Sequence, residues 1–245
     1  MIRLIFVALF VVLFLIIGIP VLGIEWLIGK VSKKTMDYSS LRLVQWAFNM
    51  IIKLAGIELT VIGEENISEG PVLYIGNHRS FFDILLTYVL CPNVTGYVAK
   101  KEMERYPLLS NWMRNLYCLF LDREDIKQGL KTILQAADYV KSGISVCIFP
   151  EGSRNKNADE TDMLSFHDGS FKIATRAKSP IIPIAISNSA NIWEANFPKM
   201  SPTHVVIEYG KPIIPSELDR DTQRHLGAYT QNIIKEMLIK NKELV

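Results

Sequence analysis

The sequence has few cysteines, and they do not form a recognisable pattern. Its 245 residues include three cysteines, an odd number, and no two of them form a C-x-x-C pair. All three lie in or beside apolar runs, which argues against a disulfide framework and against a zinc site. We expect small core residues in a reducing compartment and no metal, because no ligand cluster is present. The cysteines are Cys91, Cys118 and Cys147.

An excess of charge of either sign is also missing. The 27 lysines and arginines stand against 25 aspartates and glutamates, which leaves a formal net charge of +2. No basic block of the kind that follows a nucleic-acid backbone occurs, so nucleic acid is not expected as a partner. The length suits a substantial core, and one α/β domain with a membrane element is the simplest organisation.

Apolar residues are abundant at the N-terminus. No charged residue occurs from Leu4 to Ile24, a stretch about as long as the roughly 20 residues that cross a bilayer as a helix. The run exceeds a signal-peptide core and lacks a small-x-small cleavage site, so we expect a transmembrane or membrane-inserted helix over residues 1–30. Pro20 leaves open a helix that dips into one leaflet. Cationic residues are denser after the run, which places the part of the chain that follows it on the cytoplasmic face.

Residues 31–60 are predicted to be a helical segment close to the membrane. From Leu41 to Ile57 this segment is apolar almost all round, which suits a helix at the membrane surface and suits a buried domain helix equally well. Residues 61–245 then alternate between strand-like and helical runs. This alternation predicts an α/β domain, with a mixed, largely parallel sheet flanked by helices and preceded by the N-terminal membrane helix.

Polar residues gather in a turn after the strand predicted over residues 72–75. The turn carries His78 and Asp83, with Ser80 as the expected N-cap of a helix, and the carboxyl end of a strand is where open α/β sheets bind ligands. Residues five apart point about 140° away from each other within one helix, so the two meet only if His78 precedes the helix. His78 would then be a general base for a substrate hydroxyl and Asp83 would fix its tautomer. A capping pair with a structural histidine is the alternative.

A second polar turn follows the apolar strand predicted over residues 144–149. Arg154 offers a fork of N–H donors that matches phosphate oxygens, and Gly152 allows the backbone to approach a ligand closely. Glu151 is expected to accept hydrogen bonds from glycerol hydroxyls or to hold Arg154 in place. An ordinary surface turn with a salt bridge is the alternative.

Together, the two turns resemble the signature blocks of the glycerolipid acyltransferase superfamily, most closely those of the 1-acyl-glycerol-3-phosphate acyltransferases. The resemblance covers roughly residues 73–187. The first turn is similar to the family's Asn-His-x-x-x-x-Asp block, which implies His78 as base and Asp83 as its partner. Residues 149–154 are similar to the Phe-Pro-Glu-Gly-Thr-Arg block, which is associated with the glycerol-phosphate end of the substrate. The substrate-binding residues implied there are Glu151, Gly152, Ser153, which replaces the threonine, and Arg154.

Further segments extend this resemblance. Arg123 follows an apolar-Asp block and Lys100 lies in an Ala-Lys-Lys-Glu segment, which implies two more contacts to the substrate phosphate. Tyr117 departs from the pattern, because the family often has glycine there. The strand at 181–185 is similar to a fourth block that helps line the acyl site, although plain core is the simpler interpretation. The His167-Asp168 pair matches a helix start that has no catalytic role, so we expect surface residues.

The resemblance implies transfer of a fatty acyl group from an acyl thioester to the sn-2 hydroxyl of 1-acyl-sn-glycerol-3-phosphate, giving phosphatidic acid. The donor is acyl-CoA or acyl carrier protein, and no cofactor is needed. N–H donors near Ser80 are expected to stabilise the oxyanion. The alternatives are a related acyltransferase acting on another lysophospholipid, glycerol-3-phosphate or an amino-acid lipid, a hydrolase, and a non-catalytic lipid-binding protein. The joint presence of His78, Asp83, Glu151 and Arg154 argues against the last.

Overall fold

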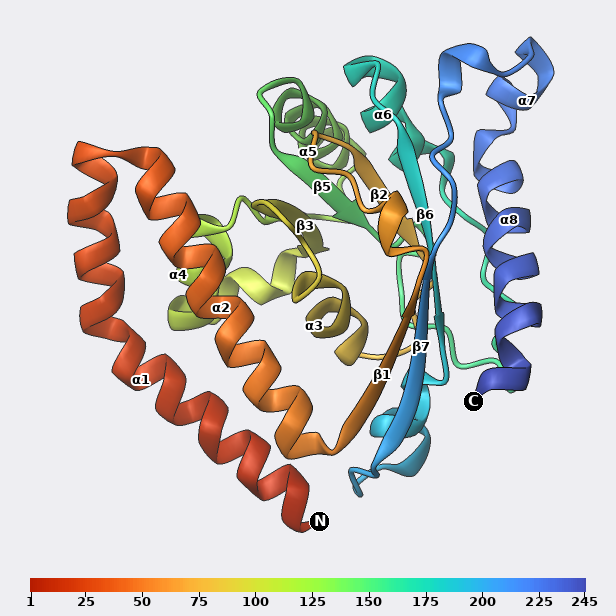
Figure 1. The fold of residues 1–245 in the computed structure, drawn as a ribbon. Coiled ribbons are helices and arrows are strands. Elements are labelled where there is room, and N and C mark those ends of the chain that lie inside the picture. Colours follow the sequence, from red (N-terminus) through yellow and green to blue (C-terminus); the bar gives the residue numbers. More distant parts are fainter.

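A computed structural model describes residues 1–245 and places seven strands in one sheet, in the order β1-β7-β6-β2-β5-β3-β4 (Figure 1). All neighbouring strands run parallel except β6 and β7. The α/β class and the mixed, largely parallel sheet are therefore confirmed. The strands are β1 (Ile57–Ile62), β2 (Leu73–Gly76), β3 (Thr95–Lys100), β4 (Leu119–Leu121), β5 (Ser145–Ile148), β6 (Ile181–Ser187) and β7 (Thr203–Tyr209).

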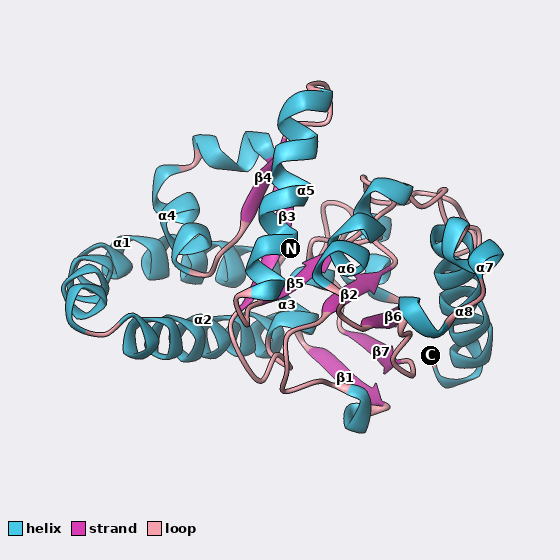
Figure 2. Cartoon of the chain, turned by 90° about the horizontal axis from the view of Figure 1, so that it is seen from above, coloured by secondary structure: helices cyan, strands magenta, loops and turns pink.

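Helices cover both faces of the sheet (Figures 1 and 2). Side chains therefore alternate between two buried cores along each central strand. In β6, Ile182 and Ile184 pack toward the core that contains α2 and α3, whereas Ile181 and Ala185 pack toward the core that contains α5, α6 and α8. The helices are α1 (Ile2–Val31), α2 (Lys33–Ala55), α3 (Phe82–Tyr88), α4 (Pro107–Asn115), α5 (Ile126–Lys141), α6 (Lys172–Ala177), α7 (Arg220–Arg224) and α8 (Leu226–Asn241).

The first two helices form a hairpin beside the domain. In α1 an 18-residue stretch has a mean hydropathy of 3.2, and only 11% of it is buried, so the helix is long and apolar enough to cross a membrane. It nevertheless packs along α2 and against Trp112 of α4, whose indole meets α1 at Gly18. α2 in turn buries one face in the domain, where Gln45 donates to the backbone oxygen of Cys91 at 2.8 Å. This buried face agrees with a domain helix, and the interpretation as a helix at the membrane surface stays a prediction for the exposed face.

The helical segment ends earlier than the predicted boundary at residue 60. Gly56 has a left-handed φ of 75° and ends α2, because glycine adopts this conformation without a steric penalty. Residues 57–60 then begin β1, which pairs only with β7, from Ile57 opposite Thr203 to Ile62 opposite Glu208.

The carboxyl ends of β2, β5, β3 and β4 lie along one edge of the sheet. Ile75 is in register with Ile148, Tyr97 with Cys147, and the β3–β4 pairing continues that alignment. Because these strands are parallel, the turns that follow them gather at this edge, where open α/β sheets bind ligands.

Candidate active site

The turn between β2 and α3 brings His78 and Asp83 into contact. Nδ1 of His78 lies 2.9 Å from Oδ2 of Asp83, and the same oxygen accepts the backbone N–H groups of Arg79 and Ser80, both at 2.8 Å. The Asp83 side chain is fully buried, whereas that of His78 keeps 15% of its surface exposed. When Nδ1 donates to the carboxylate, Nε2 is the nitrogen that can take a proton.

The helix after this turn starts at Phe82, later than expected, and Ser80 still contacts its first residue. The hydroxyl oxygen of Ser80 accepts the N–H of Phe82 at 3.1 Å. Asp83, within the first turn of α3, accepts the N–H groups of Arg79 and Ser80 that precede the helix. The N–H of Phe81 also has a carboxylate acceptor, Glu194, at 2.8 Å. The donors near Ser80 are therefore all occupied, and the expectation that they stabilise an oxyanion is wrong.

Neighbouring strands hold the His78 turn from both sides. Asn77 exchanges two hydrogen bonds with the backbone of Ile186 in β6, at 2.8 and 2.9 Å. The imidazole of His78 stacks on the ring of Phe149 with centroids 4.5 Å apart. Gly76 makes this possible, because a Cβ there would lie 3.1 Å from the Phe149 ring. The orientation of the base is thus fixed by packing as well as by Asp83.

Glu151 supports the His78 turn through backbone hydrogen bonds. Its Oε1 accepts the backbone N–H of His78 at 2.7 Å, and its Oε2 accepts that of Leu164 at 2.9 Å. The side chain is buried, and this burial raises the pKa of its carboxyl, although the two N–H donors act in the opposite direction. The expected contact to Arg154 is not formed, because Arg154 pairs with Glu194 instead. The contact to glycerol hydroxyls stays a prediction.

Gly152 and Ser153 complete this second turn. Gly152 has a left-handed φ of 71°, and a Cβ on it would lie 3.1 Å from Nε2 of His167. Glycine is therefore needed both for the backbone conformation and for space. Ser153 is exposed and makes no side-chain hydrogen bond, and His167 and Asp168 are exposed too, as expected for residues at the surface.

Arg154 is oriented by two contacts. Its Nη1 donates to Oε1 of Glu194 at 2.9 Å, and its guanidinium lies over the ring of Phe81, 3.7 Å from the centroid. The Arg154 side chain is 32% exposed, and its other N–H groups have no protein acceptor. A guanidinium held in this way presents free donors to an anion. Glu194 was not identified from the sequence, because it lies in a loop without a motif.

Lys100 and Arg123 lie farther along the same edge. Lys100 ends β3 and pairs with Glu102 at 2.7 Å, and Arg123 lies in the turn between β4 and α5. Burial lowers the pKa of Arg123, and nearby Glu102 opposes this shift. β3 and β4 are two and three strands from β2, which corresponds to about 10 and 14 Å at the usual strand spacing. The structure does not bring either side chain into contact with Arg154.

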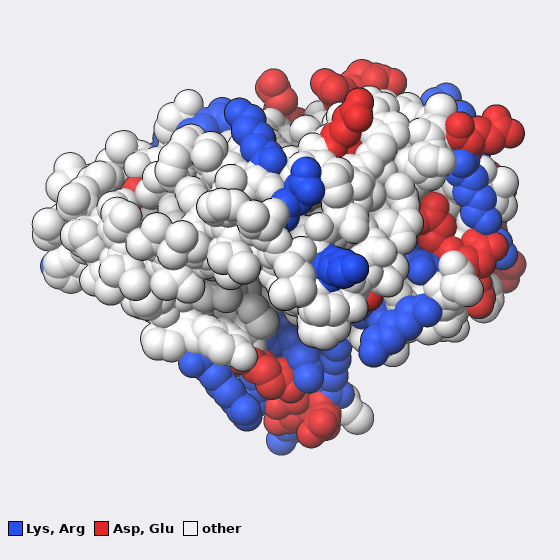
Figure 3. All heavy atoms as spheres, turned by 90° about the horizontal axis from the view of Figure 1, so that it is seen from below, with Lys and Arg blue, Asp and Glu red and all other residues white.

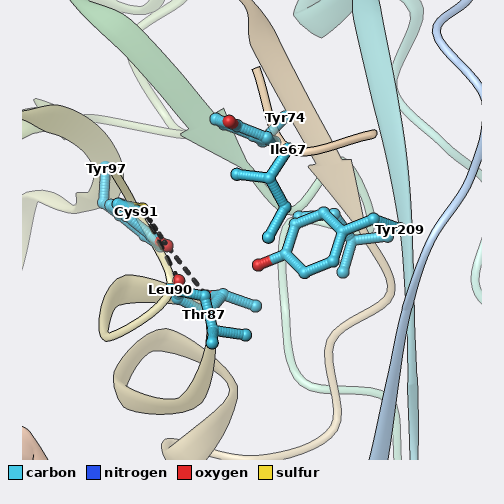
Figure 4. Close-up of a pocket in the computed structure, with 8 residues that line it drawn as sticks. Ile67, Tyr74, Thr87, Leu90, Cys91, Tyr97 and Tyr209 are labelled. Carbon is cyan, nitrogen blue, oxygen red and sulfur yellow. Dashed lines mark hydrogen bonds between the residues drawn. The ribbon is translucent and has the colours of Figure 1, made fainter. Parts of the chain in front are cut away.

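A narrow, mostly apolar pocket, too tight to hold a water molecule, lies beside α3 and apart from the His78 edge (Figure 4). Tyr97 and Thr87 are hydrogen-bonded at 2.8 Å in its wall, and the hydroxyl of Tyr209 points into it. Within residues 181–185 only Ile184 lines it, and the whole segment is buried, which agrees with plain core. The complete lining is Ile67, Tyr74, Thr87, Leu90, Cys91, Tyr97, Ile184 and Tyr209.

In the structure, no three His, Cys, Asp or Glu side chains lie close enough together to hold a metal ion.

The fold and the two turns define an acyltransferase, and comparison with known proteins agrees. The acyltransferase family model matches residues 58–187, and the chain belongs to this family. The resemblance found in the sequence is thereby confirmed.

Named relatives fall within one group. A 1-acyl-sn-glycerol-3-phosphate acyltransferase of Saccharomyces cerevisiae is 29% identical over 82% of this chain and 67% of its own length. One of Cocos nucifera is 31% identical over 72% of this chain and 56% of its own length. The crystal structure of the 1-acyl-sn-glycerophosphate acyltransferase PlsC from Thermotoga maritima matches 98% of this chain and 97% of its own, with a TM-score of 0.78 and 19% identity, and so shares the fold.

Proposed function

We propose that this protein transfers a fatty acyl group from an acyl thioester to the sn-2 hydroxyl of 1-acyl-sn-glycerol-3-phosphate and forms phosphatidic acid. The observation that carries the proposal is the pairing of His78 with a fully buried Asp83, next to a guanidinium that has free N–H donors. The names of the yeast and coconut relatives support this acceptor.

His78 is the proposed general base. Its Nε2 takes the proton of the sn-2 hydroxyl as the oxygen attacks the thioester carbonyl, so that a C–O bond forms. The C–S bond then breaks, and the imidazolium returns the proton to the leaving thiolate. Asp83, 2.9 Å from Nδ1, stabilises the imidazolium during the interval. No covalent enzyme intermediate is required.

Arg154 is the proposed primary contact for the acceptor phosphate. Arg154 lies on the same turn as Asn155, whose backbone N–H donates to the backbone oxygen of His78 at 2.7 Å. The guanidinium is therefore on a segment joined directly to the base. Lys100 and Arg123 are proposed as outer contacts, because they lie farther along the edge. The donor is acyl-CoA or acyl carrier protein, which present the same thioester.

The bilayer is the proposed source of the acceptor. Figure 3 shows a broad face without charged side chains on the side where α1 and α2 lie. The exposed apolar residues of α1 include Leu13, Ile16 and Ile17. Since α1 packs on α2 and α4, its insertion would hold the catalytic domain beside the membrane. The excess of Lys residues after α1 supports a cytoplasmic orientation.

A transfer assay tests the reaction. Membranes containing the wild type or His78→Ala are incubated with 1-acyl-glycerol-3-phosphate and an acyl donor whose acyl group is radiolabelled. The donor is either acyl-CoA or acyl carrier protein loaded with the acyl group. We expect labelled phosphatidic acid from the wild type only. Labelled free fatty acid formed without an acceptor would indicate a hydrolase. Product formed with glycerol-3-phosphate or another lysolipid alone would move the proposal to that acceptor.

A further inference from the structure

The loop between β6 and β7 carries one carboxylate to the active-site edge. This loop, residues 188–202, is called the strap below, and its carboxylate belongs to Glu194. Oε2 of Glu194 accepts the hydroxyl of Ser80 at 2.7 Å, and Oε1 accepts the backbone N–H of Phe81 at 2.8 Å and Nη1 of Arg154 at 2.9 Å. A single side chain therefore joins the His78 turn to the Arg154 turn.

The strap is itself well anchored, so Glu194 has a fixed origin. Ile192, two residues before Glu194, is completely buried, and the neighbouring Trp193 packs against Phe81 with ring centroids 6.0 Å apart. Asn188 at the start of the strap donates to the backbone oxygen of His204 in β7 at 2.8 Å. Movement of the carboxylate relative to the sheet is restricted by these contacts.

The contact with Arg154 leaves that residue able to bind an anion. A guanidinium has five N–H donors, and Glu194 accepts one of them. Phe81 covers one face of the group. The ion pair is partly exposed, with 32% and 19% of the two side chains accessible, so its value for stability is small. Its main effect is on the position of the guanidinium.

We propose that Glu194 is a positioning residue that fixes the Arg154 guanidinium relative to the His78 turn. If Arg154 holds the acceptor phosphate, as the proposed function requires, this tie sets the distance between the phosphate and the base. A small misplacement of a reacting group can reduce the rate by about 100-fold. Glu194 thereby aligns the acceptor hydroxyl with His78 without touching the substrate.

Steady-state kinetics of three variants test the effect on the reaction. Glu194→Ala removes all three hydrogen bonds, and we expect the KM for the lysolipid to rise and kcat to fall, each about 10- to 100-fold, with the KM for the acyl donor unchanged. Glu194→Gln keeps the shape and can still bond to all three partners, so it should restore most of both parameters. In an Arg154→Ala background, Glu194→Ala should raise the acceptor KM little further. Lys199→Ala, on the exposed part of the strap, is the control.

Hydrogen exchange measured by mass spectrometry tests the contact between Glu194 and the His78 turn without measuring activity. The peptide that contains residues 78–82 should exchange faster in Glu194→Ala than in the wild type and Lys199→Ala, and at the wild-type rate in Glu194→Gln. Unchanged exchange in Glu194→Ala, or a Glu194→Gln variant as impaired as Glu194→Ala, would overturn the proposal. If the wild type does not acylate the lysolipid at all, the proposed function fails, and the exchange rates still decide whether Glu194 fixes the turn.

Discussion

The backbone N–H of His78 donates a 2.7 Å hydrogen bond to Oε1 of Glu151, a residue of a different turn. The next three N–H groups along the chain also donate to carboxylates, two to Asp83 and one to Glu194. Four consecutive peptide groups are thus held by three acidic side chains from three parts of the sequence. This arrangement fixes the position of His78 before any substrate binds, so the active site needs little reorganisation during the reaction.

Substitution of either member of the His78–Asp83 pair should cause a large loss of turnover. His78→Ala should lower kcat by about 10²–10⁴-fold, the usual contribution of a general base. Asp83→Asn retains an oxygen that can accept the turn's N–H bonds but cannot stabilise the imidazolium, so kcat should fall substantially there too. Both are measured as acyl transfer at saturating substrates. His204→Ala is the control and should retain full activity, because this histidine lies on β7 and its ring is hydrogen-bonded to Thr60. If His78→Ala turned over as fast as the wild type, His78 would have no part in the mechanism.

Glu151 predicts a specific pH dependence of stability. Burial raises the pKa of its carboxyl above 4.5, so the folded protein binds this proton more tightly than the unfolded chain. The stability contributed by this protonation is greatest below the unfolded pKa and decreases as the pH rises through the raised folded pKa. The free energy of unfolding of the wild type relative to Glu151→Gln should therefore decrease from pH 4 upward and then level off.

Chemical denaturation at a series of pH values measures that difference. At neutral pH, Glu151→Gln should still be less stable by about 1–3 kcal/mol, because its amide can accept only one of the two buried N–H groups. Glu58→Gln, at an exposed side chain of β1, is the matched control and should follow the wild-type profile. Parallel profiles for the wild type and Glu151→Gln would contradict the predicted shift.

The three cationic candidates should differ in their effect on acceptor binding. Arg154→Ala should raise the KM for the lysolipid by about 10- to 100-fold, as expected for loss of a charge-assisted hydrogen bond of about 1.5–3 kcal/mol. Arg154→Lys should not restore it, since an ammonium lacks the planar fork. Arg123→Ala should have a smaller effect, and Lys100→Ala the smallest, because Lys100 is already paired with Glu102. Arg105→Ala is the control, and an equal effect of all three would contradict this ranking.

The exposed face of α1 predicts membrane binding that depends on its apolar character. Ile16→Asp places a charge on this face at a side chain that is 53% exposed. If the helix enters hydrocarbon, the charge costs about 2.5–3.5 kcal/mol, so binding to lipid vesicles should weaken roughly 100-fold. Flotation with vesicles measures it. Ile239→Asp, equally exposed on α8 across the sheet from α1, should float like the wild type.

Local sequence patterns predicted much of the architecture. The strands β2, β5 and β6 follow short-range rules, because each is an apolar run, and they were predicted over residues 72–75, 144–149 and 181–185. The meeting of His78 and Asp83 was predictable because a turn is the only place where that spacing allows contact. Their catalytic roles, like those of the other site residues, stay predictions.

Long-range contacts explain what the sequence did not predict. The hydroxyl oxygen of Ser80 accepts the N–H of Phe82 at the helix start, but the hydroxyl also donates to Glu194, which is 114 residues away. Glu151 likewise faces backbone groups that only the packing of β5 beside β2 brings close. α4 was not predicted at all, although it provides Trp112 as a contact for α1. No periodicity or spacing within a short window encodes such partners.

The pairing of β1 with β7 has a consequence for synthesis. β1 directly follows the helical hairpin, yet its only partner strand is the last of the sheet. At 5–20 residues per second, a ribosome needs on the order of 10 s to make the intervening chain. During that time the edge of β1 that β7 later covers has no partner, and unpaired strand edges tend to associate with other chains. Nascent chains stalled before Thr203 should therefore be cut by protease near β1, and chains stalled well past Tyr209 should resist.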